Sequence, residues 1–311
     1  YRARRQRQMC IRDRFNTMFL SRRKFLNYIN CTGLTAISTP LFGSIQSSDN
    51  HHLLNYFKFS VGEIKITIVS DGGFQLPISS IDINSSEENL KKHLKHYHMQ
   101  EDHIYMNTNL AVIEVEDKKL LIDVGSGSRF IGNTGKLFDN LTNANIDPES
   151  ITNVFLTHAH PDHILGIRDD FDETIFPNAE FMISEKEYGW WTKKNRVNEV
   201  DETFMQMVLW AQNSLNAIPE ISLFNNEKSI LPGVTVFETS GHSPGHSSIL
   251  IESKGSKLII GGDVIRNTYT SLKNPDFIPD TDMDPVLAQK TRFNILDLIT
   301  QEKIPYLGYH F

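Results

Sequence analysis

Residues 157–163 read Thr-His-Ala-His-Pro-Asp-His and place three histidines and an aspartate within six positions, directly after an apolar run. Imidazole nitrogens and carboxylate oxygens are the ligands that borderline divalent metals such as zinc prefer. One short segment cannot easily surround a single ion with all four groups. The spacing therefore predicts two adjacent metals and a fold that brings further ligands to this segment.

Three further candidate ligands each follow a short β-prone run. His242 lies in residues 241–246, Gly-His-Ser-Pro-Gly-His, after a run at 234–238. Asp263 follows the run 257–260, and His310 follows the run 304–307. Because a rigid sheet can present ligands from the loops at its edge, we expect these side chains to gather with the first segment. His246 is expected to support packing or to orient a ligand.

Each candidate also has a simpler interpretation when it is taken alone. Asp263 could cap the end of a strand, and a single histidine such as His242 is more often an ordinary polar residue. Together with the four groups of 157–163, however, the candidates supply a complete set for two metals. The predicted ligands are His158, His160, Asp162, His163, His242, Asp263 and His310, of which Asp162 and Asp263 are also predicted to be catalytic.

Composition excludes several classes of function. The 311 residues suffice for one large domain or two small ones, and no apolar stretch reaches the roughly 20 residues of a membrane-spanning helix. Residues 1–24 hold nine Lys/Arg and one acid, and the rest of the chain has 22 basic against 37 acidic residues, a net charge of −15. This net negative charge disfavours nucleic acid as a partner, because it repels a phosphate backbone. The only cysteines, Cys10 and Cys31, lie near the N-terminus, so the remainder has no thiolate ligand or nucleophile.

The N-terminal region is interpreted as processing sequence. Residues 21–26, Ser-Arg-Arg-Lys-Phe-Leu, precede a mildly apolar stretch and resemble a twin-arginine export signal, which we place at 18–48. The alternative is a basic surface helix. Residues 1–17 are interpreted as upstream or non-native sequence. The expected location is periplasmic or secreted, without membrane attachment after export.

The pattern of elements predicts an α+β fold over residues 57–311. Strands are expected at 61–69, 151–156, 180–183, 235–238, 247–251 and 257–260, with a hairpin at 110–115 and 119–123. Helices are expected at 136–145, from 185, within 201–217 and at 285–300. Residues 123–127 lack the lysine of a phosphate loop and are interpreted as a tight turn that supports the site. Two rounds of strands and helices indicate two packed sheets with helices outside.

These motifs resemble the metallo-β-lactamase superfamily along residues 57–311. The resemblance implies an αββα sandwich of two mixed sheets, packed face to face with helices on both outer faces, and a dinuclear zinc centre at one sheet edge. It also implies that His158, His160 and His242 hold one metal. Asp162, His163 and His310 would hold the other, and Asp263 would bridge the two.

Within the superfamily, the likeness is to methyl parathion hydrolase-like proteins. It rests on residues 61–72, 121–127, 176–179 and 241–246. The resemblance places Phe130, Trp191 and Phe204 in a substrate pocket with Trp190 beside them, and the alternative for these aromatics is core packing. That family continues beyond its last histidine, so we expect this chain to be truncated at its C-terminus.

The predicted function is a dinuclear zinc hydrolase that cleaves ester-type bonds of a small molecule, an organophosphate triester or an aryl ester, with a metal-bridging hydroxide as nucleophile. An acyl-homoserine lactonase or another lactonase of the same fold has the same seven ligands and is the main alternative. A non-catalytic metal-binding module would require lost ligands, and none is lost. A homodimer is left open.

Overall fold

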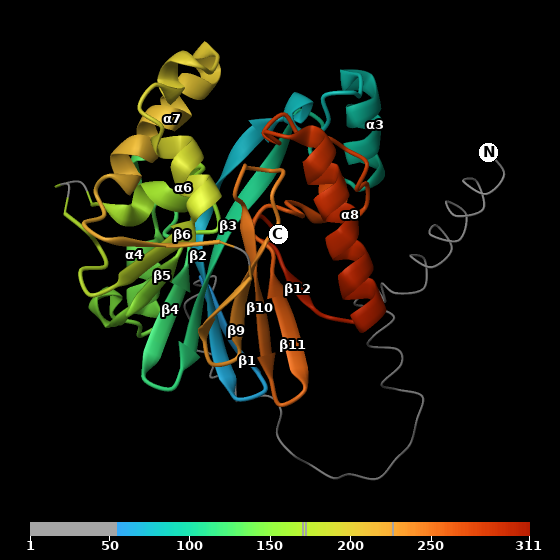
Figure 1. The fold of residues 1–311 in the computed structure, drawn as a ribbon. Coiled ribbons are helices and arrows are strands. Elements are labelled where there is room, and N and C mark those ends of the chain that lie inside the picture. Colours follow the sequence, from blue (N-terminus) through green and yellow to red (C-terminus); the bar gives the residue numbers. More distant parts are fainter. Residues whose placement is uncertain (1–54, 170, 172, 226) are drawn as a thin grey trace, which may run out of the picture. The chain divides into compact units, whose positions relative to one another are not determined.

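Two β-sheets pack face to face in the part of the chain that the structure describes (Figure 1). The structure is a computed structural model that describes residues 55–169, 171, 173–225 and 227–311. The chain divides into two units, Tyr1–His52 and Leu53–Phe311, and only the second is described here. The predicted export signal, the upstream residues and both cysteines therefore lie outside the described residues.

Both sheets are mixed, as expected. In the larger sheet, β1 to β4 pair antiparallel and β4 to β7 pair parallel. In the smaller sheet only β11 and β12 are parallel. The larger sheet contains, in order, β1 (Tyr56–Val61), β2 (Ile64–Pro77), β3 (His103–Val115), β4 (Lys118–Ile122), β5 (Asn153–Phe155), β6 (Glu180–Ser184) and β7 (Ile221–Phe224). The smaller contains β12 (Tyr306–Leu307), β11 (Ser256–Ile260), β10 (Ser247–Ser253), β9 (Val234–Glu238) and β8 (Lys228–Leu231).

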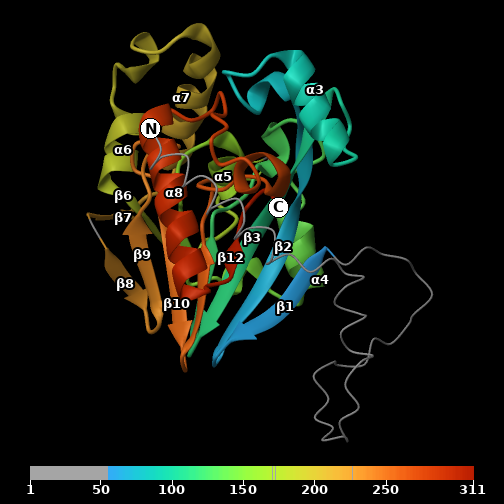
Figure 2. The same cartoon turned by 90° about the vertical axis from the view of Figure 1, so that its right-hand side faces the viewer.

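Helices cover the outer faces of the sandwich, so the expected fold class is confirmed. α4 (Leu137–Asn143), α6 (Glu185–Thr192) and α7 (Glu202–Leu215) share a core with the larger sheet. α8 (Pro285–Glu302) lies over the smaller sheet, as Figure 2 shows. The remaining helical elements are α3 (Glu87–His96), α5 (Pro161–Ile164), the 3-10 turns η1 (Ile78–Ser80), η2 (Gly127–Arg129), η3 (Pro148–Ser150), η4 (Leu165–Ile167) and η5 (Arg196–Asn198), and the π-helix η6 (Thr268–Leu272).

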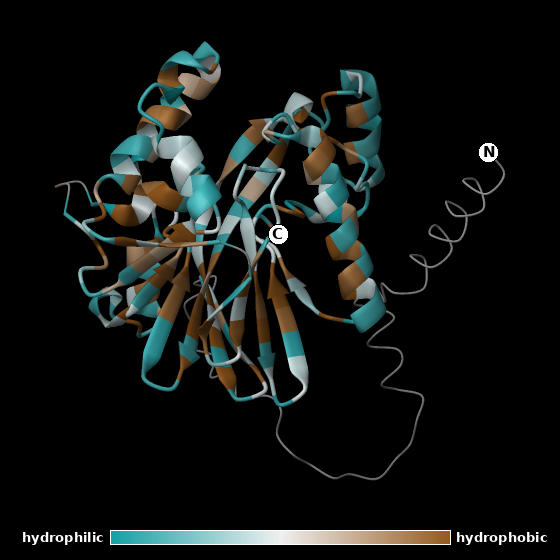
Figure 3. Ribbon diagram, in the orientation of Figure 1, coloured by the Kyte–Doolittle hydropathy of each residue, from teal (hydrophilic) through white to brown (hydrophobic). Residues whose placement is uncertain are grey.

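Two apolar layers stabilise the sandwich, and a single strand can contribute side chains to both layers. In β3, Ala111 and Ile113 face the layer between the sheets, while Leu110 and Val112 face the helices. This follows from the alternation of side chains along a strand. Because both faces are covered, β3 is apolar at successive positions, and Figure 3 shows hydrophobic residues both on the strands and on the helices that cover them. None of the described helices is long and apolar enough to cross a membrane.

The predicted strand at 61–69 is wrong in its extent. The structure has a hairpin there, with β1 ending at Val61 and β2 beginning at Ile64. Gly62 between them has a positive φ of 57°, which glycine adopts without steric cost. The alternation from Ile64 onward is real, but the glycine marks a turn. The hairpin of β3 and β4 is confirmed, and β12 lies in the β-prone run at 304–307, whereas β7 and β8 were not predicted as elements.

Candidate metal centre

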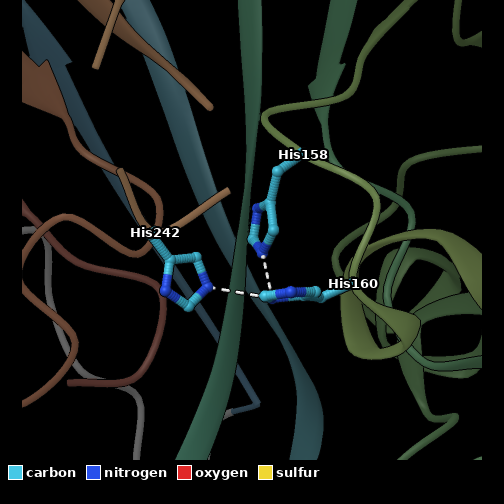
Figure 4. A group of neighbouring side chains, drawn as sticks. All are labelled: His158, His160 and His242. Carbon is cyan, nitrogen blue, oxygen red and sulfur yellow. Dashed lines mark hydrogen bonds between the residues drawn. The ribbon is translucent and has the colours of Figure 1, made fainter. Parts of the chain in front are cut away.

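Three predicted histidine ligands converge on one point (Figure 4). His158 and His160 lie in the loop after β5, and His242 lies in the loop between β9 and β10. The Nδ1 atom of His160 is 3.0 Å from Nε2 of His158 and 2.9 Å from Nε2 of His242. Burial, reinforced by the neighbouring imidazoles, lowers the pKa of His158 and His160 well below the usual value. These rings are therefore neutral and can offer lone pairs to a metal.

The second predicted group lies beside the first. Asp162 and His163 belong to the single turn of α5, and His310 follows β12. Oδ2 of Asp162 is 3.5 Å from Nε2 of His163 and 3.4 Å from Nε2 of His310. All three side chains are buried, so a metal held here would be shielded from solvent.

Asp263, from the loop after β11, lies between the two groups. Its Oδ2 atom is 3.4 Å from Nε2 of His242 and 3.2 Å from Nε2 of His310. Its other oxygen, Oδ1, is 3.4 Å from Nε2 of His163. One carboxylate thus contacts ligands of both groups, which is the placement that a bridging ligand requires.

The chemistry of these side chains fits a pair of divalent cations. Nε2 of His163 and Oδ1 of Asp263 are buried and have no hydrogen-bond partner among the described residues. Burial lowers the pKa of His163, but the carboxylates of Asp162, Asp123 and Asp263 raise it well above its usual value. Buried polar atoms without partners are costly unless another group satisfies them. Cations between these carboxylates and imidazoles would do so.

Asp123 orients one of the ligands. Nδ1 of His163 lies 2.8 Å from Oδ2 of Asp123, and the same carboxylate accepts hydrogen bonds from the backbone N–H and the hydroxyl of Thr157. A carboxylate at Nδ1 fixes the proton there and leaves Nε2 free for a metal. The turn predicted to support the site at 123–127 begins with this residue, which has a positive φ of 59°.

His246 holds the backbone of Asp263. Burial lowers the pKa of His246 to about 3, so its ring is neutral. Nε2 accepts a hydrogen bond of 3.0 Å from the backbone N–H of Asp263, and Nδ1 lies 2.8 Å from Oγ1 of Thr239. The expectation that His246 supports the site without being a ligand agrees with these contacts.

Two acidic residues that the sequence did not single out hold the ligand loops. Glu187 of α6 is fully buried and accepts hydrogen bonds from the backbone of Ala159 and of Gly245. Asp282 contacts Nδ1 of His242 at 2.9 Å and accepts from Nη2 of Arg292. In sequence both look like ordinary surface acids, because their burial depends on tertiary packing.

The predicted pocket aromatics fall into two kinds. Trp191 is fully buried and donates its indole N–H to Glu187, so it belongs to the core, as the alternative interpretation held.

Phe204 is half-buried, with its ring centroid 6.4 Å from that of His160. Trp190 is half-buried under the guanidinium of Arg196. Phe130 is half-buried and packs on Phe74, which in turn contacts the ring of His310. Phe204, Trp190 and Phe130 stay predicted pocket residues.

Metal removal should destabilise the protein. A ligand at 1000 times its Kd stabilises the folded state by about 4 kcal/mol per site, and the apo site leaves buried carboxylates and imidazoles crowded together. We expect a chelator to lower the free energy of unfolding by several kcal/mol, measured by urea titration before and after dialysis. Adding zinc back should restore it, and identical curves for both forms would contradict a metal centre.

Comparison with known proteins agrees with this geometry. A family model described as the metallo-beta-lactamase superfamily matches residues 105–303. The N-acyl homoserine lactonase AiiA of Bacillus thuringiensis subsp. kurstaki is 22% identical over 218 residues, which cover 64% of this chain and 79% of the relative. A Bacillus cereus N-acyl homoserine lactonase is 23% identical over 220 residues, with the same two coverages.

Solved structures of known proteins resemble this fold. AidC, described as a dizinc quorum-quenching lactonase, has a TM-score of 0.76 and 27% identity, covering 82% of this chain and 90% of its own. The hydrolase AbOPH has a TM-score of 0.77 at 24% identity, covering 83% and 91%, and shares the fold. The expected likeness to methyl parathion hydrolase is not supported, since the curated relatives are lactonases.

Proposed function

The chain belongs to the metallo-beta-lactamase superfamily, and from that premise we propose that it is a dinuclear metal hydrolase that opens the ring of N-acyl homoserine lactones. The observation that carries this proposal is the convergence of all seven predicted ligands, with Asp263 in contact with both groups. The choice of a lactone over other esters is supported by lactonases among the relatives in both sequence and structure. The lactonase alternative is therefore preferred to the organophosphate triester.

A pair of divalent ions in this site would supply Lewis acidity and lower the pKa of water towards neutrality. The chain's own residues would position the reactants. Asp263 fixes the two ligand groups relative to one another. Asp162 places Oδ2 near His163 and His310, and its carboxylate would accept a proton and deliver it to the departing ring oxygen.

A phosphotriester or aryl ester is the second candidate substrate. The half-buried aromatic side chains of Phe204, Trp190 and Phe130 favour it, because flat apolar surfaces suit an aryl leaving group. A non-catalytic metal-binding module is not favoured, since none of the seven predicted ligands is missing from the site.

A substrate panel tests the proposal. The metal-loaded protein would be assayed with N-hexanoyl homoserine lactone, an aryl phosphotriester and phenyl acetate. We expect kcat/KM for the lactone to exceed that for the others by at least about tenfold, a difference of about 1.4 kcal/mol in transition-state binding. A His242→Ala variant, purified in parallel, controls for contaminating hydrolases. A higher kcat/KM for the phosphotriester would replace the lactonase with the second candidate.

A further inference from the structure

Arg266 is a buried cation at the metal centre, and most of its donors are unused. It follows Asp263 by three residues and only 6% of its surface is exposed. Its one hydrogen bond to the described residues runs from Nη1 to Oγ1 of Thr281, at 2.6 Å. Nε lies 3.4 Å from Oδ2 of Asp263 but makes no hydrogen bond. Because a guanidinium has five N–H donors, most of its capacity is left for another group.

Arg292 shows what a purely structural arginine looks like in the same region. It is 1% exposed, and its three nitrogens donate to Asp282 and to the backbone carbonyls of Val264, Pro275 and Phe277. Those contacts account for its burial, because a buried charge is tolerated when it is paired and hydrogen-bonded. Arg266 is almost equally buried without such a set. The charge of Arg266 helps to lower the pKa of Asp282, but the hydrogen bonds of the described residues do not join these two side chains. The remaining N–H donors of Arg266 therefore call for a partner that is not part of the folded chain.

The contact with Asp263 does not supply that partner. At 3.4 Å and without hydrogen-bond alignment it is a loose ion pair. A carboxylate that shares its charge with metal ions also attracts a neighbouring guanidinium less strongly. With the metals bound, Arg266 would therefore be poorly compensated and ready to take an anion.

We propose that Arg266 is the anion-binding residue of this site and takes a carboxylate. The planar fork of a guanidinium matches the two oxygens of a carboxylate. The identity of that carboxylate rests on the proposed function. Hydrolysis of a lactone adds one water: a new C–O bond forms at the carbonyl carbon, the ring C–O bond breaks, and the ring oxygen becomes a hydroxyl. The new acid loses its proton at neutral pH, so negative charge develops on the oxygens that Arg266 would face.

Carboxylate binding to the metal-loaded protein tests the assignment without turnover. Isothermal titration would use hexanoate, its uncharged analogue hexanamide, and N-hexanoyl-L-homoserine. We expect Arg266→Gln to raise the Kd of both carboxylates about tenfold or more, the effect of losing a charged hydrogen bond, and to leave the Kd of hexanamide unchanged. Arg266→Lys keeps the charge but not the fork, so it should give a smaller rise. Lys290→Gln removes an exposed cation from α8 and is the matched control, with no change expected.

The metal content of each variant separates anion binding from a role in holding Asp263. Two metals per chain in Arg266→Gln, together with weaker carboxylate binding, support the proposal. Loss of metal from that variant, or unchanged carboxylate affinity, overturns it. Arg266-dependent binding of hexanoate in a protein that opens no lactone would refute the proposed function and leave this inference standing. If the protein hydrolysed lactones and the wild type and Arg266→Gln bound carboxylates with equal affinity, the proposed function would be supported and the role of Arg266 in anion binding refuted.

Discussion

Replacement of Asp263 by alanine is expected to abolish metal binding and hydrolysis together. Asp263 contacts His242 in one ligand group and both His163 and His310 in the other, so its carboxylate touches ligands of both groups. Its loss should cost more than the roughly 10–100-fold in metal affinity or activity that follows when a group that only orients a ligand is removed. Metal per chain, measured by plasma emission, and kcat/KM for the lactone should fall in parallel.

Two companion variants sharpen this experiment. Asp263→Asn keeps the shape of the side chain but removes its charge, so it should retain less metal than wild type and more than the alanine variant. Asp297→Ala removes an exposed carboxylate from α8 and should change neither quantity. Full metal content and full activity in Asp263→Ala would show that the two groups do not depend on a shared carboxylate.

The gathering of the candidate metal ligands could be predicted from sequence because their chemistry is local. His158, His160, Asp162 and His163 fall within six residues, and the loop after a strand is a natural place for them. The remaining ligands, His242, Asp263 and His310, follow runs whose apolar character marks buried strands. Sheet pairing then brings the ends of these strands to one edge, as the parallel register of β11 and β12 shows.

The residues that hold the ligands in place could not be predicted in the same way. Glu187 lies on a helix beside Lys186, which is exposed, and nothing local distinguishes the two environments. Its burial arises only when α6 packs against loops from two different sheets. Arg266 presents the same difficulty, since a single arginine after a strand usually faces solvent.

The choice among substrate classes could not be made from sequence for a related reason. The ligand motifs are shared by lactonases and by hydrolases of other esters, so they fix the metal chemistry and leave the substrate open. The likeness to methyl parathion hydrolase implied a substrate pocket lined by aromatic residues, among them Trp191. In the structure, Trp191 packs in the core and donates to Glu187, so it is a weak guide to a substrate pocket.

Replacement of Glu187 by alanine is expected to destabilise the fold as well as the site. The carboxylate accepts four hydrogen bonds: from the backbone of Ala159 and Gly245, the hydroxyl of Ser243 and the indole of Trp191. Ala159 lies between two ligands of the first loop, and Ser243 follows His242, so Glu187 ties the two ligand loops together. Each buried donor left unsatisfied costs about 1–3 kcal/mol, and we expect a total loss of at least about 3 kcal/mol.

Urea unfolding of the metal-free and the metal-loaded protein would measure this loss and locate its origin. The fall should be present in both forms, because the hydrogen bonds to Glu187 do not require a metal. Glu187→Gln keeps one acceptor oxygen but turns an amide N–H₂ towards donors, so its stability should lie between those of wild type and the alanine variant. Glu180→Ala removes an exposed glutamate of β6 and serves as the control. If Glu187→Ala were to unfold like wild type when metal-free, the two loops would be held by their ligands and metals, and α6 would have no part in fixing them.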